Sequence, residues 1–143
     1  MAIKPYKGKF KMKSVPKVVS TVFNINGLVY PDGSGAYQPA DSTSGSHLGT
    51  AAKAVASTDS DYATAGALLA VHVAEDDTCE WLADVGTGTL TTAMIGLYRD
   101  LKDDNEIDVN ATAKNVVFIK GFKSATQAII QLSSQTNRFI ATT

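Results

Sequence analysis

Cysteine, histidine and long hydrophobic runs are scarce in this sequence of 143 residues. Cys79 is the only cysteine, so the chain cannot form a disulfide within itself, and a zinc site built on cysteines is excluded. No stretch approaches the roughly eighteen apolar residues of a membrane helix. The first twenty residues are lysine-rich and lack the apolar run of a signal peptide. We therefore expect a soluble protein that is made in a cytoplasm and stabilised by packing or assembly.

Residues for catalysis or metal binding are equally few. His72 lies inside an apolar run, which is typical of a core or interface histidine, and Gly45-Ser46-His47 lies in a loop that would not hold a nucleophile in place. The acidic run Asp103–Asp108 lacks the glycine and the glutamate of an EF-hand loop. Gly86–Thr89 lacks the lysine of a P-loop. The sequence thus predicts a protein that is not an enzyme and has no cofactor and no metal.

Charge is divided along the chain although the net charge is only -1. Every acidic residue lies between Asp32 and Asp108, whereas residues 1–23 carry six lysines and no acid. We expect these first residues to form an extended basic arm, ordered mainly by a partner with an acidic surface. The residues expected to bind that partner are Lys4, Tyr6, Lys7, Lys9, Phe10, Lys11, Lys13 and Lys17. A nucleic acid is the less favoured partner for the same lysines.

The pattern of apolar residues favours strands over helices. Runs rich in β-branched and apolar residues predict strands at Val15–Phe23, 27–30, 67–74, 78–85, 115–122, 126–132 and 138–141. The polar, glycine-containing segment 31–49 predicts a long surface loop. We expect a mainly β protein, a small antiparallel barrel or sandwich with at most one or two short helices. Residues 1–23 would form the arm and first strand, and residues 24–143 a single β domain.

Two segments are ambiguous. Residues 50–57 fit either a short helical turn or a strand, and residues 87–101 have apolar residues at helical spacing, interrupted by Gly96. The expected core follows the apolar positions of the strands: Leu69, Val71, Val73, Trp81, Ile95, Leu97, Val117, Ile119, Ile129 and Leu132.

Three stretches carry a family resemblance. They are DYATAGALLAVHVAEDD at 61–77, MIGLYRDLKDDNEIDVNATAKNVVFIKGF at 94–122, and TQAIIQLSS at 126–134. The aromatic-x-Asp-Leu step at Tyr98–Leu101, the acidic turn and the Asp-Val strand that follow are the distinctive features. Because these features follow one another in this order, the segment from Asp59 to Leu132 resembles the small β-barrel decoration, or cement, proteins that tailed bacteriophages add to the outside of their capsids.

The resemblance implies a function and a location. The chain would be a virion structural protein that binds the capsid exterior and bridges neighbouring copies of the major capsid protein, and it would self-associate, most simply as a trimer. It also implies a strand where the helical spacing lies, around 94–100. Alternatives are another virion component, such as a head-completion or tail-tube subunit, or a small nucleic-acid-binding protein that uses the lysine-rich arm.

Overall fold

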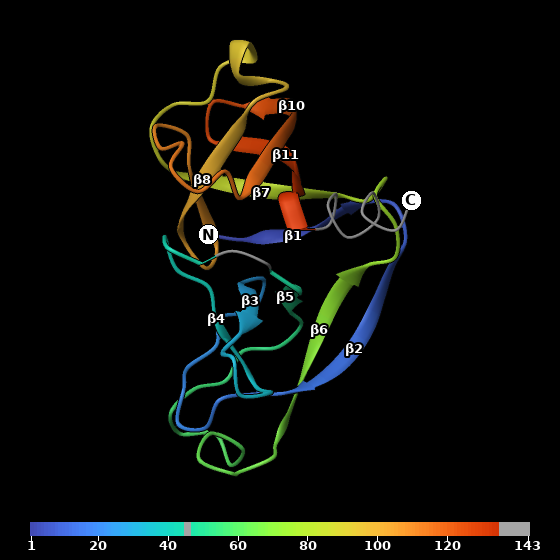
Figure 1. Cartoon of the computed structure of the whole chain (residues 1–143), viewed down its shortest axis with the longest axis vertical. Helices are drawn as coiled ribbons and strands as arrows, with labels where there is room; N and C mark the ends of the chain where they lie inside the picture. The colour runs from blue at the N-terminus through green and yellow to red at the C-terminus, as the bar shows by residue number, and fades with distance from the viewer. Residues whose placement is uncertain (45–46, 135–143) are drawn as a thin grey trace.

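The computed structural model describes residues 1–44 and 47–134, and it is mainly β, with 48% of residues in strands and 4% in helices. This confirms the predicted fold class. Figure 1 shows an elongated molecule with one sheet system above the other. The elements are β1 (Ile3–Lys7), β2 (Phe10–Pro16), β3 (Leu28–Pro31), β4 (Tyr37–Pro39), β5 (Gly49–Ala51), β6 (Leu68–Ala74), β7 (Glu80–Thr87), a 3-10 turn η1 (Thr92–Met94), β8 (Tyr98–Asp103), β9 (Glu106–Asp108), β10 (Val117–Ser124) and β11 (Gln127–Leu132).

The upper part is a closed five-stranded barrel. Its strands follow the order β7-β11-β10-β8-β9, and β9 closes the ring by pairing in parallel with β7. β1 adds to the outside of this ring by pairing antiparallel with β7. The barrel is filled by large apolar side chains with almost no exposed surface, among them Trp81, Leu101, Ile107, Ile119 and Ile130.

The lower part is a five-stranded antiparallel sheet with the order β2-β6-β5-β3-β4. Its own apolar cluster is formed by Val15, Phe23, Val29, Ala51, Val55, Leu69, Val71 and Val73. The sheet curls, because Lys17, one residue beyond β2, makes a bridge to Tyr37 of β4 at the far side.

One long ribbon of two chain segments runs through both parts. β1 and β2 follow each other, as do β6 and β7, and β1 pairs with β7 while β2 pairs with β6. The first segment passes from one sheet to the other at Gly8, whose φ is 101°, and the second passes at the turn between Ala74 and Glu80. A side chain at Gly8 would strain the backbone and would press on Cys79, whose Cα and Sγ atoms would lie 3.0 Å from the added Cβ. Figure 1 shows both segments turning the same corner.

The ribbon corrects the expectation for residues 1–23. This segment is extended, but it is ordered by its own chain, since β1 and β2 are paired strands and Ile3 is fully buried in the barrel cluster. The predicted strand Val15–Phe23 is also misplaced: β2 runs from Phe10 to Pro16, and beyond it residues 18–22 are not in a strand, while Lys17 and Phe23 make only isolated bridges. Lysines alternate with Tyr6, Phe10 and Met12 here, so the segment has little apolar character and its pairing depends on strands that are distant in the sequence.

Two other segments also differ from expectation. The predicted loop at 31–49 contains the short strand β4, and the ambiguous residues at 50–57 begin with the end of strand β5. At 87–101 the helical spacing produces only the 3-10 turn η1, and β8 begins at Tyr98, in the region where the resemblance implied a strand. The predicted strand at 138–141 lies outside the described residues.

Most of the predicted core is confirmed, but three of its members are not buried. Ile95 and Leu97 are 45% and 44% exposed, because they lie in the loop before β8 and not on a strand facing the barrel. Ile129 is only partly buried. It pairs with Leu82 on the outer face of the barrel, whereas its neighbour Ile130 pairs with Trp81 on the inner face.

The register of β11 can be tested by comparing two adjacent isoleucines. Ile130→Ala should lower the free energy of unfolding by about 3 kcal/mol, because it leaves a cavity beside Trp81. Ile129→Ala is the matched control and should cost about 1 kcal/mol, since part of that side chain already contacts solvent. Urea denaturation measures both values. Equal losses, or a larger loss for Ile129→Ala, would contradict the register.

Candidate binding surface

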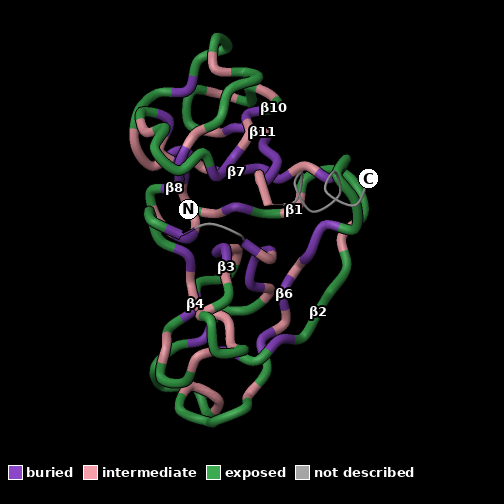
Figure 2. Tube along the Cα trace, in the orientation of Figure 1, coloured by how far each residue is buried: buried purple, intermediate pink, exposed green. Residues whose placement is uncertain are grey.

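The basic residues of the N-terminal segment lie along the ribbon that joins the two sheets. Lys4 and Lys7 are on β1, Lys9 is at the crossing, and Lys11 and Lys13 are on β2. All five are exposed, and β2 is exposed along most of its length (Figure 2). None of them makes an ion pair with another described residue; the ion pairs in the described ranges are Lys53–Asp61 and Lys102–Glu106. The ribbon therefore presents five cations to solvent.

The structure separates two predicted binding residues, Lys17 and Phe10, from this group. Lys17 is 2% exposed, and its Nζ donates to the backbone oxygens of Asp61, at 2.5 Å, and Tyr62, at 3.5 Å. Phe10 is half-buried and packs edge-on against Trp81, with 4.7 Å between ring centroids. Both side chains stabilise the fold. Tyr6 is 45% exposed, and Lys123 lies over its ring at 5.6 Å from the centroid.

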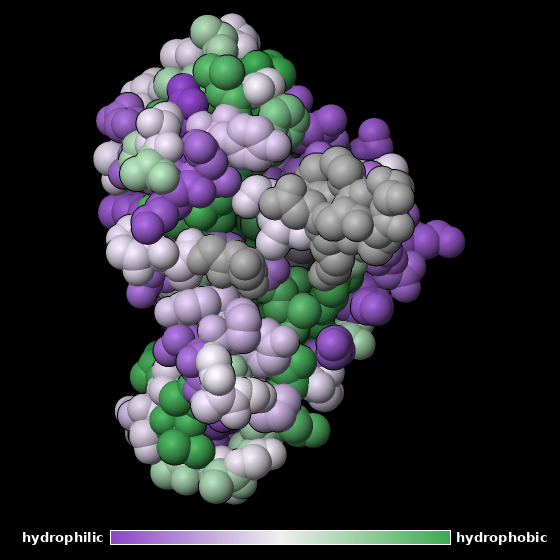
Figure 3. All heavy atoms as spheres, viewed as in Figure 1, coloured by the Kyte–Doolittle hydropathy of each residue, from purple (hydrophilic) through white to green (hydrophobic). Residues whose placement is uncertain are grey.

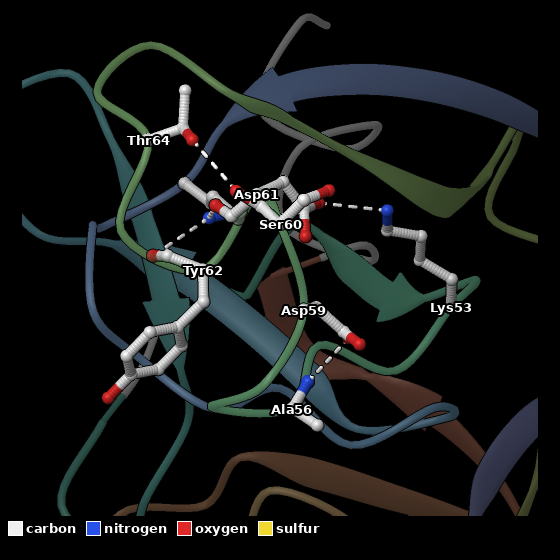
Figure 4. Close-up of polar contacts among 8 residues, drawn as sticks. Lys53, Ala56, Asp59, Ser60, Asp61, Tyr62 and Thr64 are labelled. Atoms are coloured by element: carbon white, nitrogen blue, oxygen red, sulfur yellow. Dashed lines mark hydrogen bonds and ion pairs between the residues drawn. The ribbon is translucent and has the colours of Figure 1, made fainter.

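The loop that holds Lys17 is built from short-range polar contacts (Figure 4). Asp59 accepts a hydrogen bond from the backbone N–H of Ala56 at 2.8 Å, and Thr64 donates to the backbone oxygen of Ser60 at 3.0 Å. Lys53 pairs with Asp61 at 2.9 Å, and this hydrogen bond holds the pKa of the Asp61 carboxyl below its usual value. These contacts order the loop so that its carbonyl groups face the buried ammonium of Lys17.

A second polar cluster lies around His47. The Nε2 atom of His47 is 2.9 Å from Oγ of Ser44, both residues are buried, and Ser134 donates to the backbone oxygen of His47 at 2.9 Å. Burial lowers the pKa of His47 to about 4, although the charge of Asp41 acts in the opposite direction. The cluster ties the loop before β5 to the end of β11. Residues 45 and 46, which precede His47 in the Gly-Ser-His run, lie outside the described residues.

The acidic turn between β8 and β9 contacts the other sheet. Asp104 is buried, its side chain accepts a hydrogen bond from Asn24 at 3.2 Å, and its backbone oxygen accepts one from Leu28 at 2.6 Å. Burial raises the pKa of Asp104 above its usual value. Within the described ranges, no three His, Cys, Asp or Glu side chains are grouped to hold a metal ion. Residues 1–44 and 47–134 also contain no helix with the length and apolar character needed to span a membrane.

Apolar side chains gather at the outer tip of the barrel. Ile95, Leu97 and Tyr98 are between 40% and 45% exposed, and the Tyr98 ring packs against Phe118 with 5.0 Å between centroids. We call these four residues the apolar tip. Figure 3 shows hydrophobic residues at this end of the molecule. The expected core, which followed the apolar positions of the predicted strands, included Ile95 and Leu97, so this surface was not predicted.

Comparison with known proteins adds no family to these observations. No protein-family model matches the chain, and a search of curated proteins finds no match.

The buried imidazole predicts a pH dependence of stability. Because the pKa of His47 is about 4 in the folded protein and 6.5 in the unfolded chain, the unfolded chain binds the extra proton between these values. Stability should therefore be fully present above pH 6.5 and fall by about 3 kcal/mol as the pH drops to 4. His47→Gln should remove this fall from the denaturation series. Parallel pH profiles for the two proteins would contradict the assignment.

Proposed function

We propose that this protein is a structural component of a phage particle that binds the outside of the capsid and bridges neighbouring major capsid subunits. The observation that carries the proposal is the row of five exposed lysines, without an ion-pair partner among the described residues, along a ribbon shared by both sheets. Basic residues on paired strands suit a large, fixed, acidic protein surface, because the backbone that carries them is already ordered before binding. The resemblance of residues 59–132 to capsid decoration proteins supports the same function and points to the major capsid protein as the partner.

The binding face differs from the extended arm, ordered mainly by a partner, that the sequence predicted. Lys4, Lys7, Lys9, Lys11 and Lys13 lie on or between paired strands, and Tyr6 lies among them. Long-range attraction from the lysines would steer the protein to the capsid, and many weak contacts repeated over the particle would hold it there. No bond-making step is part of this function, and it needs no cofactor or metal.

Substitution of lysines provides a cleaner test than truncation. Removing residues 1–13 would delete β1 and half of β2, and with them the buried Ile3, so the shortened protein would lose its fold along with any binding. Lys9→Gln, Lys11→Gln and Lys13→Gln together change only exposed side chains. A control with the same change in charge combines Lys102→Gln, Lys114→Gln and Lys120→Gln, which are also exposed. Its stability is measured alongside, because Lys102 pairs with Glu106 and Lys120 lies over the ring of Phe118.

The ribbon variant should bind particles of the major capsid protein encoded by the same genome at least about tenfold more weakly than the wild type. The control variant should bind within about twofold, and wild-type binding should weaken as salt rises. Particle occupancy is measured by sedimentation of the particles with bound protein. Equal loss in both variants, or a genome without a major capsid gene, would overturn the proposal. Salt-dependent binding to DNA that only the ribbon variant loses would favour the nucleic-acid alternative.

We also propose self-association as a trimer, with the apolar tip as the contact. Exposed apolar side chains are suited to burial between copies, and Ile95, Leu97 and Tyr98 lie away from the lysines. Sedimentation equilibrium of the isolated protein should give the mass of three chains. Leu97→Lys should give the mass of one chain. Val22→Lys, at a residue that is 52% exposed near the lower sheet, is the control and should leave the trimer intact. A wild-type protein that is monomeric at all concentrations would contradict this assignment.

A further inference from the structure

Among the described residues, the outward edge of strand β2 has no backbone hydrogen-bond partner, whereas the outer edges of β1 and β4 each bond to a loop and contain a proline within the strand. The ring of the barrel has no edge, and on β1 the N–H of Ile3 donates to Asn26 while Pro5 has no N–H. On β4 the backbone oxygen of Tyr37 accepts from Val18, and Pro39 has no N–H. β2 has seven residues and pairs with β6 over its whole length without a register shift.

Hydrogen bonds at the two ends of β2 show which of its residues face outward. Glu75 donates to the backbone oxygen of Lys9 at 3.0 Å, and Lys17 donates to that of Ala67 at 3.3 Å. An antiparallel ladder alternates between residues bonded to the partner strand and residues whose N–H and C=O face away from it. Lys11, Lys13 and Val15 therefore bond to β6. The backbone groups of Phe10, Met12 and Ser14 face outward.

We propose that β2 binds an extended segment of a partner protein by strand addition, and that this segment alternates acidic with apolar residues. The backbone groups of Met12 and Ser14 would supply the hydrogen bonds. Lys11 and Lys13 point to one face of the ribbon and Met12, which is 57% exposed, to the other. Acidic residues of the added strand would meet the lysines, and apolar residues would cover Met12 on the opposite face.

A second copy of this chain does not fit the edge. If two β2 strands paired antiparallel through their outward residues, every register that joins Phe10, Met12 or Ser14, except Ser14 with Ser14, would place lysines opposite each other. The Ser14–Ser14 register would set Pro16, which has no N–H, against Met12. Pairing Met12 with Met12 sets Lys11 against Lys13, and pairing Met12 with Ser14 sets Lys13 against Lys13. Like charges directly opposite each other destabilise a strand pair. The chain's own acidic-apolar run, Glu106–Val109, begins with β9, which is bonded on both sides in the barrel.

Lysine and proline on an edge strand also protect proteins from aggregation. That role alone accounts for Pro16 and for the exclusion of other copies, but it predicts no preference for any partner. Strand addition predicts a preference for one sequence pattern and protection of alternate backbone amides. The inference rests on the proposal that this face meets another protein, and it does not require that protein to be a capsid subunit.

The probe is a synthetic peptide, the length of β2, in which glutamate alternates with valine. The control peptide has the same composition with its glutamates grouped at one end. The full-length protein should bind the alternating peptide at least about tenfold more tightly in fluorescence anisotropy. Hydrogen exchange followed by NMR should then show new protection at the amides of Met12 and Ser14, and little change at those of Lys11 and Lys13, which are already bonded.

Two variants at one position separate the backbone from the side chain. Ser14→Pro removes an outward N–H without breaking a bond to β6, and it should weaken binding of the alternating peptide about tenfold or more. Ser14→Ala keeps the N–H and should bind within about twofold of the wild type. If Ser14→Pro does not fold, the exchange pattern of the wild type decides alone.

Several outcomes would overturn strand addition. They are absence of binding, equal binding of both peptides, or protection that spares Met12 and Ser14. Protection of these two amides that rises with the protein's own concentration, without peptide, would assign the edge to a second copy. If Ser14→Pro folds and still occupies capsid particles while the lysine variant does not, the proposed function stands and strand addition fails.

Discussion

The pairing of β1 and β2 with β7 and β6 is the constraint on which the two-part structure depends. The same two segments supply β1 and β7 to the barrel side and β2 and β6 to the lower sheet, so neither part is complete without the other. The corner at Gly8 is held by packing as well as by the ladder. Sγ of Cys79 donates to the backbone oxygen of Lys9 at 2.9 Å, and Phe10 packs against Trp81, the largest side chain of the barrel core. The backbone that carries the lysines is therefore held in place by contacts with the barrel core.

A second connection between the parts comes from residues 24–28. The backbone of Asn26 accepts a hydrogen bond from Ile3 of the barrel side and donates one to Ala51 of the lower sheet. Gly27 has no room for a side chain, because a Cβ there would meet the carboxylate of Asp104. The raised pKa of Asp104 shows the electrostatic cost of burying that carboxylate. Burial of the Asp104 carboxylate is thus unfavourable, but it accompanies backbone hydrogen bonds that join the two parts, from Leu28 to Asp104 and from Ile3 to Asn26.

The sequence was sufficient for the fold class and for most of the core, because strands such as β6 and β10 are rich in β-branched and apolar residues. It was not sufficient to predict that the basic residues near the N-terminus form paired strands. β2 pairs through its backbone, and its alternating lysines carry no apolar signal, so only the distant partner β6 defines it as a strand. The same limit applies to Lys17, whose burial depends on carbonyl groups in a loop more than forty residues away. The lysine surface itself was predicted, whereas the open edge and the apolar tip required the strand register.

The positions of the lysines also restrict how copies can assemble. Charge repulsion keeps β2 edges apart, so contact between copies must use another surface, and the apolar tip lies at the far end of the barrel from β2 (Figure 1). A trimer formed through the tips would leave three β2 edges directed away from its centre. Each edge would then be free for an acidic strand of the proposed partner. Like-charge repulsion between copies and attraction to an acidic partner would thus assign the two ends of the molecule to two different contacts.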